Sequence, residues 1–226
     1  MSKINFVLDL DQTLISAEAN EDYDFDENKD KSRLFQYKDM DGYYIVFERP
    51  GLQKFLDYIF KHFNVSIWTA ASKDYALFII EHMILRKSGR KLDWIFFSYH
   101  CDISKKHKGK SKDLTVLTDI FKLPGYTQEN TIILDDYDEV YKTQPTMCVA
   151  AKPFEYSDVG SENDKYMYQL IKAMKQVDKE SKGTDPYAVR VQHSLDNSSS
   201  KNSDKSSSKN SERARKLYLI HLIINE

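Results

Sequence analysis

Two aspartates one residue apart follow a mainly apolar run near the start of the chain. The run occupies residues 4–8, and Asp9, Asp11 and Thr13 follow it at alternate positions. Because side chains at i and i+2 of an extended chain point to the same side, the two carboxylates can face one point just beyond a strand. The run is typical of a buried parallel strand, and open α/β sheets bind ligands at the carboxyl ends of such strands. The pair alone also fits an Asp-rich turn, but adjacent carboxylates repel each other unless a hard cation such as Mg²⁺ lies between them.

The complete pattern is more restrictive than the aspartate pair. It reads Asp9-Leu10-Asp11-Gln12-Thr13-Leu14 directly after the apolar run. This pattern resembles the nucleophile motif of the haloacid dehalogenase superfamily. In this form it is similar to the motif of the carboxy-terminal-domain phosphatases that act on RNA polymerase II and of their NLI-interacting-factor relatives. The resemblance covers roughly residues 4–178 and implies a Rossmann-like α/β fold, with a central parallel sheet flanked by helices and a small β-hairpin insert.

A second segment matches the same family further along the chain. Thr69 and Ala70 follow an expected strand at residues 65–68, and an Arg-Pro-Gly segment that also matches the family precedes that strand. Small and hydroxyl side chains at a strand end leave room for a phosphate group and can hold its oxygens. A threonine at this place is also a common helix cap, so the segment is weak by itself.

The third and fourth matching segments carry a lysine and two acids. Lys112 stands immediately before Asp-Leu at an expected helix start, as in the family's third motif. Three other lysines lie close by, so the choice of Lys112 depends on this match. Asp135 and Asp136 follow an expected strand at residues 131–134. Tyr-Asp comes next instead of the family's usual Ser-Pro, which leaves the shape of this loop open.

The resemblance implies a role for each of these residues. Asp9 attacks phosphorus to form an aspartyl-phosphate, and Asp11 protonates the leaving oxygen and then activates water. Mg²⁺ is the implied cofactor, held by Asp9, Asp136 and the main-chain carbonyl of Asp11. Asp135 supports the site by holding Lys112 or a water. The residues that bind the phosphoryl group are Thr13, Thr69, Ala70 and Lys112.

Residues 1–180 are expected to form the phosphatase domain, with hairpin inserts at about 33–48 and 97–111, the second of which is implied by the family resemblance. The first insert has an Asp-Gly pair between two aromatic runs, which is a strong hairpin signal. Its aromatic side chains either line the entrance to the site or pack one face of the hairpin: Phe35, Tyr37, Tyr43 and Tyr44. The second insert carries a basic run, Lys105 to Lys110, which is either a solvated face or a basic lip that attracts a phosphorylated ligand.

The C-terminal part differs in composition from the domain. Residues 181–212 are rich in Ser, Lys and Asn and are expected to form a disordered linker, because so polar a segment buries little apolar surface. Residues 213–226 contain an apolar stretch that is too short to span a bilayer and is expected to dock on the domain or on a partner.

Composition narrows the class of protein. A chain of 226 residues with 41% hydrophobic content suffices for one domain with a substantial core, and a net charge of -2 gives no reason to expect direct nucleic-acid binding. The two cysteines lack metal-type spacing and are expected to be a buried side chain and a loop thiol, not a disulfide, which suits a reducing compartment. With no leader or membrane span in the sequence, we expect a soluble intracellular protein, nuclear or cytoplasmic, without a membrane partner. The Lys, Asn, Ile and Tyr bias indicates an AT-rich genome, such as that of a large DNA virus.

Three function classes remain open at this stage. The favoured one is a phosphatase for phosphoserine or phosphothreonine in an extended, proline-containing protein or peptide, such as the RNA polymerase II C-terminal domain. The second is a small-molecule or nucleic-acid-end phosphatase, because one fold serves many substrates. The third is a non-catalytic binding module. The presence of all five motif residues argues against the third class: Asp9, Asp11, Thr69, Lys112 and Asp136.

Overall fold

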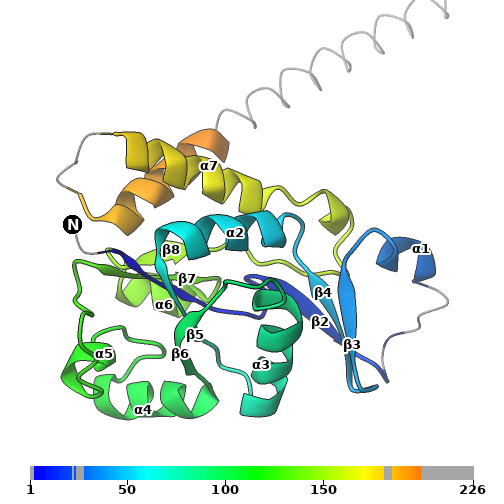
Figure 1. The fold of residues 1–226 in the computed structure, drawn as a ribbon, viewed down its shortest axis with the longest axis horizontal. Coiled ribbons are helices and arrows are strands. Elements are labelled where there is room, and N and C mark those ends of the chain that lie inside the picture. Colours follow the sequence, from blue (N-terminus) through cyan, green and yellow to red (C-terminus); the bar gives the residue numbers. More distant parts are fainter. Residues whose placement is uncertain (1–2, 22, 24–27, 181–184, 200–226) are drawn as a thin grey trace, which may run out of the picture.

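The protein is described here by a computed structural model over residues 3–21, 23, 28–180 and 185–199. Five parallel strands form its central sheet (Figure 1), in the spatial order β6 (Leu92–Phe96), β5 (Asn64–Trp68), β1 (Asn5–Leu8), β7 (Thr131–Asp135) and β8 (Cys148–Ala150). Leu8 at the end of β1 pairs with Ile67 of β5 and with Leu134 of β7, so these three strands end side by side. The predicted α/β class is therefore confirmed.

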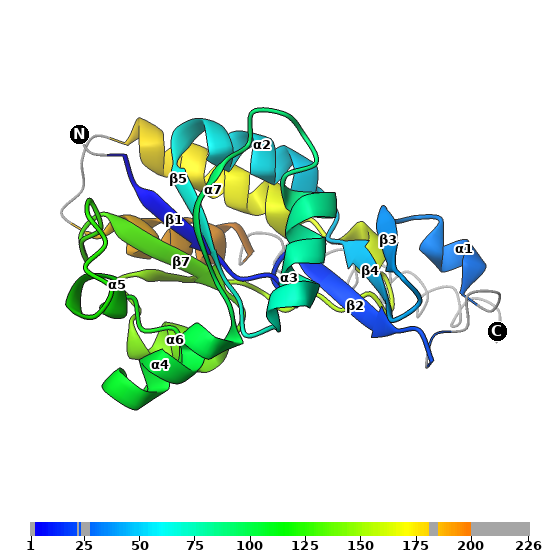
Figure 2. The same ribbon diagram turned by 60° about the horizontal axis from the view of Figure 1, so that its bottom comes forward.

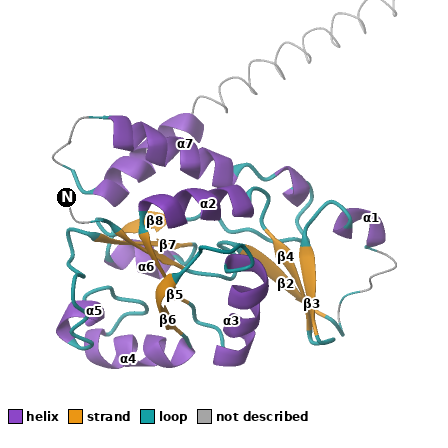
Figure 3. Ribbon diagram, viewed as in Figure 1, coloured by secondary structure: helices purple, strands orange, loops and turns teal. Residues whose placement is uncertain are grey.

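Helices cover both faces of this sheet, as Figures 1 and 3 show. One face carries α2 (Leu52–His62) and α7 (Tyr166–Lys179), and the other carries α4 (Ser98–Lys108), α5 (Val116–Asp119) and α6 (Asp138–Thr143). Helix α3 (Lys73–Ile79) continues into a π-helical turn, Ile80–Ile84, and shares the core of α2. Side chains of β1 alternate between the two cores, because Phe6 and Leu8 face α2 and α7 whereas Val7 faces the opposite layer. Burial on both faces explains the nearly continuous apolar sequence of β1.

A second, antiparallel sheet extends from the end of β1 (Figure 2). It consists of β2 (Ile15–Ala19), β4 (Tyr44–Glu48) and β3 (Tyr37–Met40) in that order, next to the short helix α1 (Lys29–Ser32). Asp41 and Gly42 both have positive φ, 48° and 79°, which is the turn geometry that an Asp-Gly hairpin requires. The first predicted hairpin is thus present.

The aromatic residues of this sheet take different positions. Phe35 is buried in a small core with Phe47 and Tyr156. The rings of Phe47 and Tyr156 stack at a centroid distance of 3.6 Å. Tyr37 contacts the ring of Phe47, and Tyr43 is exposed. Packing on the hairpin is therefore the correct interpretation for Phe35, whereas Tyr44 lines a cleft described below.

The second predicted hairpin is wrong, because residues 98–108 form the helix α4 instead. The ring nitrogen Nδ1 of His100 accepts the Phe97 amide hydrogen at 3.0 Å and so caps the start of the helix. Cys101 and Ser104 lie one turn apart on its buried face, and Gly109 ends it with a φ of 69°. Local capping and one buried stripe favour a helix here.

The predicted linker also differs from the structure in its first part. Residues 187–199 form a helix that packs against α2 and α7. Helix α7 itself is preceded by a short 3-10 turn, Ser161–Asn163. Ala188, Val191 and Leu195 are buried there, at the spacing of one helical face. The overall polarity of residues 181–212 concealed this apolar stripe. Residues 200–212 of the linker and the apolar segment 213–226 lie outside the described residues.

Candidate active site

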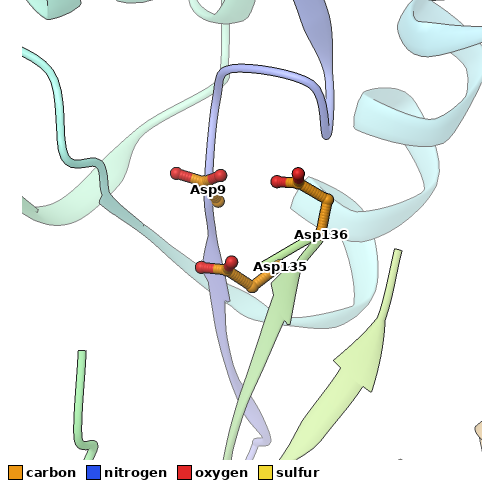
Figure 4. Close-up of side chains that lie close together, drawn as sticks. All are labelled: Asp9, Asp135 and Asp136. Carbon is orange, nitrogen blue, oxygen red and sulfur yellow. The ribbon is translucent and has the colours of Figure 1, made fainter. Parts of the chain in front are cut away.

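Three aspartates meet where β1 and β7 end. Asp9 follows β1 directly, Asp135 is the last residue of β7, and Asp136 comes next (Figure 4). One carboxylate oxygen from each lies within 4.8 Å of one from the others. The adjacent, parallel ends of β1 and β7 bring acids more than 120 residues apart in sequence to one edge of the sheet.

Lys112 is the cation of this cluster. Its Nζ lies 2.6 Å from Asp9 Oδ1 and 2.7 Å from Asp135 Oδ2, and all three side chains are buried. Burial alone lowers the pKa of Lys112, but the carboxylates of Asp9 and Asp135 outweigh burial and raise this pKa, so the ammonium stays charged. The motif match therefore selected, from several neighbouring lysines, one that reaches the acids.

The backbone around Lys112 is unusual and well anchored. Lys112 has a φ of 48°, in the left-handed region that lysine rarely adopts. Gln144 fixes this segment, because its Nε2 donates to the Lys112 carbonyl at 2.8 Å and its Oε1 accepts the Leu114 amide hydrogen at 3.0 Å. The left-handed backbone and the two hydrogen bonds of Gln144 thus fix the segment from which the Lys112 ammonium reaches Asp9.

Thr13 is paired with Asp136. Its Oγ1 donates to Asp136 Oδ1 at 3.0 Å and accepts the Asp136 amide hydrogen at 3.1 Å, while Asp9 Oδ2 lies farther away, at 3.4 Å. The hydroxyl expected to bind phosphate is thus engaged by Asp136 in this structure. The contact orients the Asp136 carboxylate toward Asp9.

The charge of the cluster favours a cation. Burial, followed by the charge of Asp9, raises the pKa of Asp135 to about 7 and that of Asp136 to about 6. Asp135 already uses both oxygens, since Oδ2 binds Lys112 and Oδ1 accepts the Tyr137 amide hydrogen at 2.9 Å. Asp9 and Asp136 therefore remain as the carboxylates best placed to bind an ion. These oxygen donors, in a cluster with one lysine for three acids, fit a hard divalent cation.

Asp11 lies outside the three-acid cluster and has a different partner. Tyr75 Oη donates to Asp11 Oδ1 at 2.6 Å, and both side chains are partly buried. Burial, more than the charge of Asp9, raises the pKa of Asp11. No motif in the sequence indicated a function for Tyr75. The signal that was available was its place in the first turn of α3, the helix that follows the Thr69 segment.

Thr69 is buried at the end of β5, and Ala70 beside it is exposed. Thr69 Oγ1 accepts the Ala71 amide hydrogen at 3.0 Å, which is the local contact that a threonine before a helix commonly makes. This contact uses a lone pair of the hydroxyl and leaves its proton available for a further acceptor. The threonine can therefore serve the turn and still donate to a ligand.

Comparison with known proteins places this arrangement in a family. Residues 4–184 match the model of the NLI interacting factor-like phosphatases. The chain belongs to this family. This agrees with the resemblance seen in the four motifs, and makes the chain a member of a phosphatase family within the haloacid dehalogenase superfamily.

Two viral relatives of the family are similar over most of their length. The CTD phosphatase-like protein 355R of Invertebrate iridescent virus 6 is 47% identical over 171 residues, which cover 74% of this chain and 94% of the relative. The protein of the same name from Invertebrate iridescent virus 3 is 42% identical over 180 residues, covering 74% and 93%. The solved structure of Fcp1, an essential RNA polymerase II CTD phosphatase, aligns with a TM-score of 0.47 at 18% identity, over 87% of this chain and 62% of Fcp1. The two viral relatives are consistent with a viral source, which was one of those expected from the composition.

Arg49 is a buried residue beside this site, and the sequence motifs assigned it no function. Its Nη1 donates to the Thr13 carbonyl at 3.0 Å. Its Nε and Nη2 donate to the two oxygens of Asp164 at 3.1 and 3.0 Å, and its guanidinium lies 4.5 Å from the centre of the Tyr166 ring. Arg49 therefore joins the loop after β1 to the start of α7. The Arg-Pro-Gly match was the available signal.

An open cleft of about 420 Å³ adjoins the NLI interacting factor-like site on the side of Asp11. It lies between the antiparallel sheet and the start of α3, and two of its lining residues, Tyr44 and Tyr75, contact each other edge to face at a centroid distance of 5.4 Å. Its lining consists of Asp11, Gln12, Ser16, Ala17, Tyr44, Ala71, Ser72, Tyr75 and Glu155.

None of the helices within the described ranges has both the length and the apolar composition of a membrane span.

Proposed function

We propose that this chain is an Mg²⁺-dependent phosphoprotein phosphatase that hydrolyses phosphoserine or phosphothreonine through an aspartyl-phosphate on Asp9. The observation that supports it most is the Lys112 ammonium, held between Asp9 and Asp135 at 2.6 and 2.7 Å. A nucleophilic carboxylate that approaches a phosphate dianion needs nearby positive charge. Two of the three ammonium hydrogens bond the carboxylates, and the third remains for a phosphoryl oxygen.

The chain's own residues then carry the two steps. In the first, an Asp9 oxygen forms a bond to phosphorus, the bond from phosphorus to the serine oxygen breaks, and Asp11 gives its proton to that oxygen. In the second, Asp11 takes a proton from water, the water oxygen bonds to phosphorus, and the bond from Asp9 to phosphorus breaks. Thr69 Oγ1 and the Ala70 main chain contribute hydrogen bonds to the phosphoryl oxygens.

The carboxylate set also fits a resident cation. Asp9, Asp136 and the main-chain carbonyl of Asp11 would hold Mg²⁺, which would offset negative charge on the transferring phosphoryl group. Thr13 holds Asp136 in place through the 3.0 Å hydrogen bond to Oδ1. Lys112 bonds Asp9 through Oδ1 and is also held by Asp135, which would leave Asp9 Oδ2 for the cation.

The shape of the entrance supports a peptide substrate, and the similarity to viral CTD phosphatase-like proteins supports CTD-like peptides. The cleft beside Asp11 is open and has two tyrosine rings on its walls. An extended segment that contains proline can lie against such rings, whereas a small metabolite would leave the site open to water. We therefore propose that the substrates are phosphoserine peptides with a neighbouring proline, such as those of the RNA polymerase II C-terminal domain.

A substrate panel tests this proposal. With Mg²⁺, kcat/KM for a phosphoserine-proline peptide is expected to exceed that for sugar phosphates and nucleotides at least about tenfold, or roughly 1.4 kcal/mol. Excess chelator should abolish turnover, and Asp9→Asn should do so without loss of folding. Asp102→Asn, at an exposed position of α4, is the control. Faster turnover of a nucleotide or a 3′-phosphorylated DNA end than of every phosphopeptide would favour the other substrate class, and full activity in chelator would exclude the metal.

A further inference from the structure

We infer that the Tyr75 hydroxyl positions Asp11 for proton transfer to the leaving serine oxygen, an inference that rests on the phosphatase function proposed above. Tyr75 belongs to α3 and Asp11 to the loop after β1, so they are 64 residues apart in sequence. The Tyr75 Oη to Asp11 Oδ1 distance of 2.6 Å is that of a strong hydrogen bond from a hydroxyl to a carboxylate. Tyr75 is therefore a positioning residue, which acts on the reaction through Asp11.

The tyrosine ring is itself held firmly enough to orient a partner. Ala76 and Ile79 anchor α3 in the core behind it. On its open side the ring of Tyr44 contacts it edge to face, at 5.4 Å and an interplanar angle of 79°. The hydroxyl therefore reaches Asp11 from a ring that is fixed by both the helix and the antiparallel sheet.

The hydrogen bond also decides which carboxyl oxygen carries the acid proton. A carboxyl group has two oxygens, and a phenol hydroxyl that donates to Oδ1 occupies that oxygen as an acceptor. The transferable proton of Asp11 then resides on Oδ2. In the first step this proton passes from Oδ2 to the serine oxygen as the bond to phosphorus breaks, and in the second Oδ2 takes a proton from water. Without the tyrosine hydroxyl the carboxyl can rotate, and fewer encounters place the proton on the leaving oxygen.

Dependence on the leaving group separates this role from a general structural one. A serine alkoxide is a poor leaving group and needs the proton, whereas 4-nitrophenolate leaves readily without it. The value of kcat/KM covers only the steps up to formation of the aspartyl-phosphate, so it reports proton donation and not the later hydrolysis. A loss of positioning must therefore appear in kcat/KM for the peptide and leave that for the aryl ester almost unchanged.

The experiment compares Tyr75→Phe with a matched control. The control is Tyr58→Phe, because Tyr58 Oη donates to Asp178 Oδ2 at the same distance of 2.6 Å, between α2 and α7. Both variants keep the ring and lose one hydroxyl, and urea unfolding of each gives its effect on folding. For a phosphoserine-proline peptide with Mg²⁺, Tyr75→Phe should lower kcat/KM at least about tenfold, with KM within about twofold. For 4-nitrophenyl phosphate it should lower kcat/KM by less than about twofold.

The possible outcomes each decide the matter. If Tyr75→Phe lowers kcat/KM equally for both substrates, its effect is structural, and the inference is wrong. If it lowers neither, the hydroxyl has no part in the reaction. If the peptide loss in Tyr58→Phe equals that in Tyr75→Phe, the effect is not specific to Asp11. A wild-type protein that turns over neither substrate contradicts the proposed function itself, a result distinct from a selective loss in the variant.

Discussion

Lys112 Nζ lies 2.6 Å from Asp9 Oδ1 although 103 residues separate the two in the chain. The same ammonium lies 2.7 Å from Asp135 Oδ2, so one buried cation joins the segments that follow β1 and β7. Two carboxylates that would otherwise repel each other are thereby held in the interior. The contact links the stability of the domain to the chemistry of the site.

Lys112→Met should therefore destabilise the protein as well as inactivate it. The substitution keeps most of the apolar stem but leaves Asp9 and Asp135 as buried, unpaired carboxylates, which costs about 3–5 kcal/mol. Urea unfolding without metal measures this loss. Lys142→Met is the control, since its pair with Asp138 at 2.8 Å is exposed and should contribute nothing measurable. A Lys112→Met protein as stable as the wild type would contradict the buried ion pair.

Arg49→Lys should not preserve stability, although it preserves the charge. The guanidinium donates to both oxygens of Asp164 and to the Thr13 carbonyl, and an ammonium cannot reproduce that planar set of donors. We expect a loss of about 3 kcal/mol, as for other broken buried pairs, by urea unfolding. A double-mutant cycle with Asp164→Ala should give a coupling free energy well above that of an exposed pair. Full stability of Arg49→Lys would show that the paired geometry is unimportant.

Thr13→Val should weaken Mg²⁺ binding more than folding. Valine has nearly the same shape as threonine but loses both hydrogen bonds to Asp136, at 3.0 and 3.1 Å. Loss of a residue that orients a metal ligand typically lowers metal affinity about 10–100-fold. We expect a decrease of this size in Mg²⁺ affinity, measured by calorimetric titration. Thr13→Ser keeps the hydroxyl and should bind nearly as the wild type. Equal Mg²⁺ affinity in the valine variant would mean that Asp136 needs no such orientation.

Leu195→Ala tests whether the helix at residues 187–199 belongs to the domain. Leu195 is 6% exposed and lies in the core shared by α2 and α7. Its truncation should lower the free energy of unfolding by about 2–3 kcal/mol. His193→Ala, at an exposed position of the same helix, should change it by less than about 0.5 kcal/mol. Identical unfolding of the two variants would place this helix outside the cooperative unit.

The convergence of the motifs could be predicted from the sequence because it follows from topology. Parallel strands end at one edge, so residues after β1, β5 and β7 had to lie near one another. The contact of Lys112 with Asp9 depends on a left-handed backbone residue and on Gln144, which no local pattern reveals. That contact was reached only through the family resemblance.

The errors have equally local causes. The hairpin expected at 97–111 came from the resemblance, whereas the residues themselves supply a helix cap at His100 and a helix end at Gly109. A linker was expected from residue 181 because the segment is polar overall. This composition masked the few apolar residues that form the buried face of the 187–199 helix. No pattern in the sequence indicated Asp11 as the partner of Tyr75, because the two residues are 64 positions apart.

The central claim is that Asp9 carries the phosphoryl group during turnover. Incubation with a phosphoserine-proline peptide and Mg²⁺, acid quenching and borohydride reduction would convert an aspartyl-phosphate to homoserine, which peptide mass spectrometry locates. Asp11→Asn should raise the amount of the intermediate when an activated aryl phosphate is used, because its hydrolysis is slowed. The account predicts homoserine at position 9 in the wild type and none in Asp9→Asn. Active turnover without homoserine at position 9, or with the modification at another residue, would contradict it.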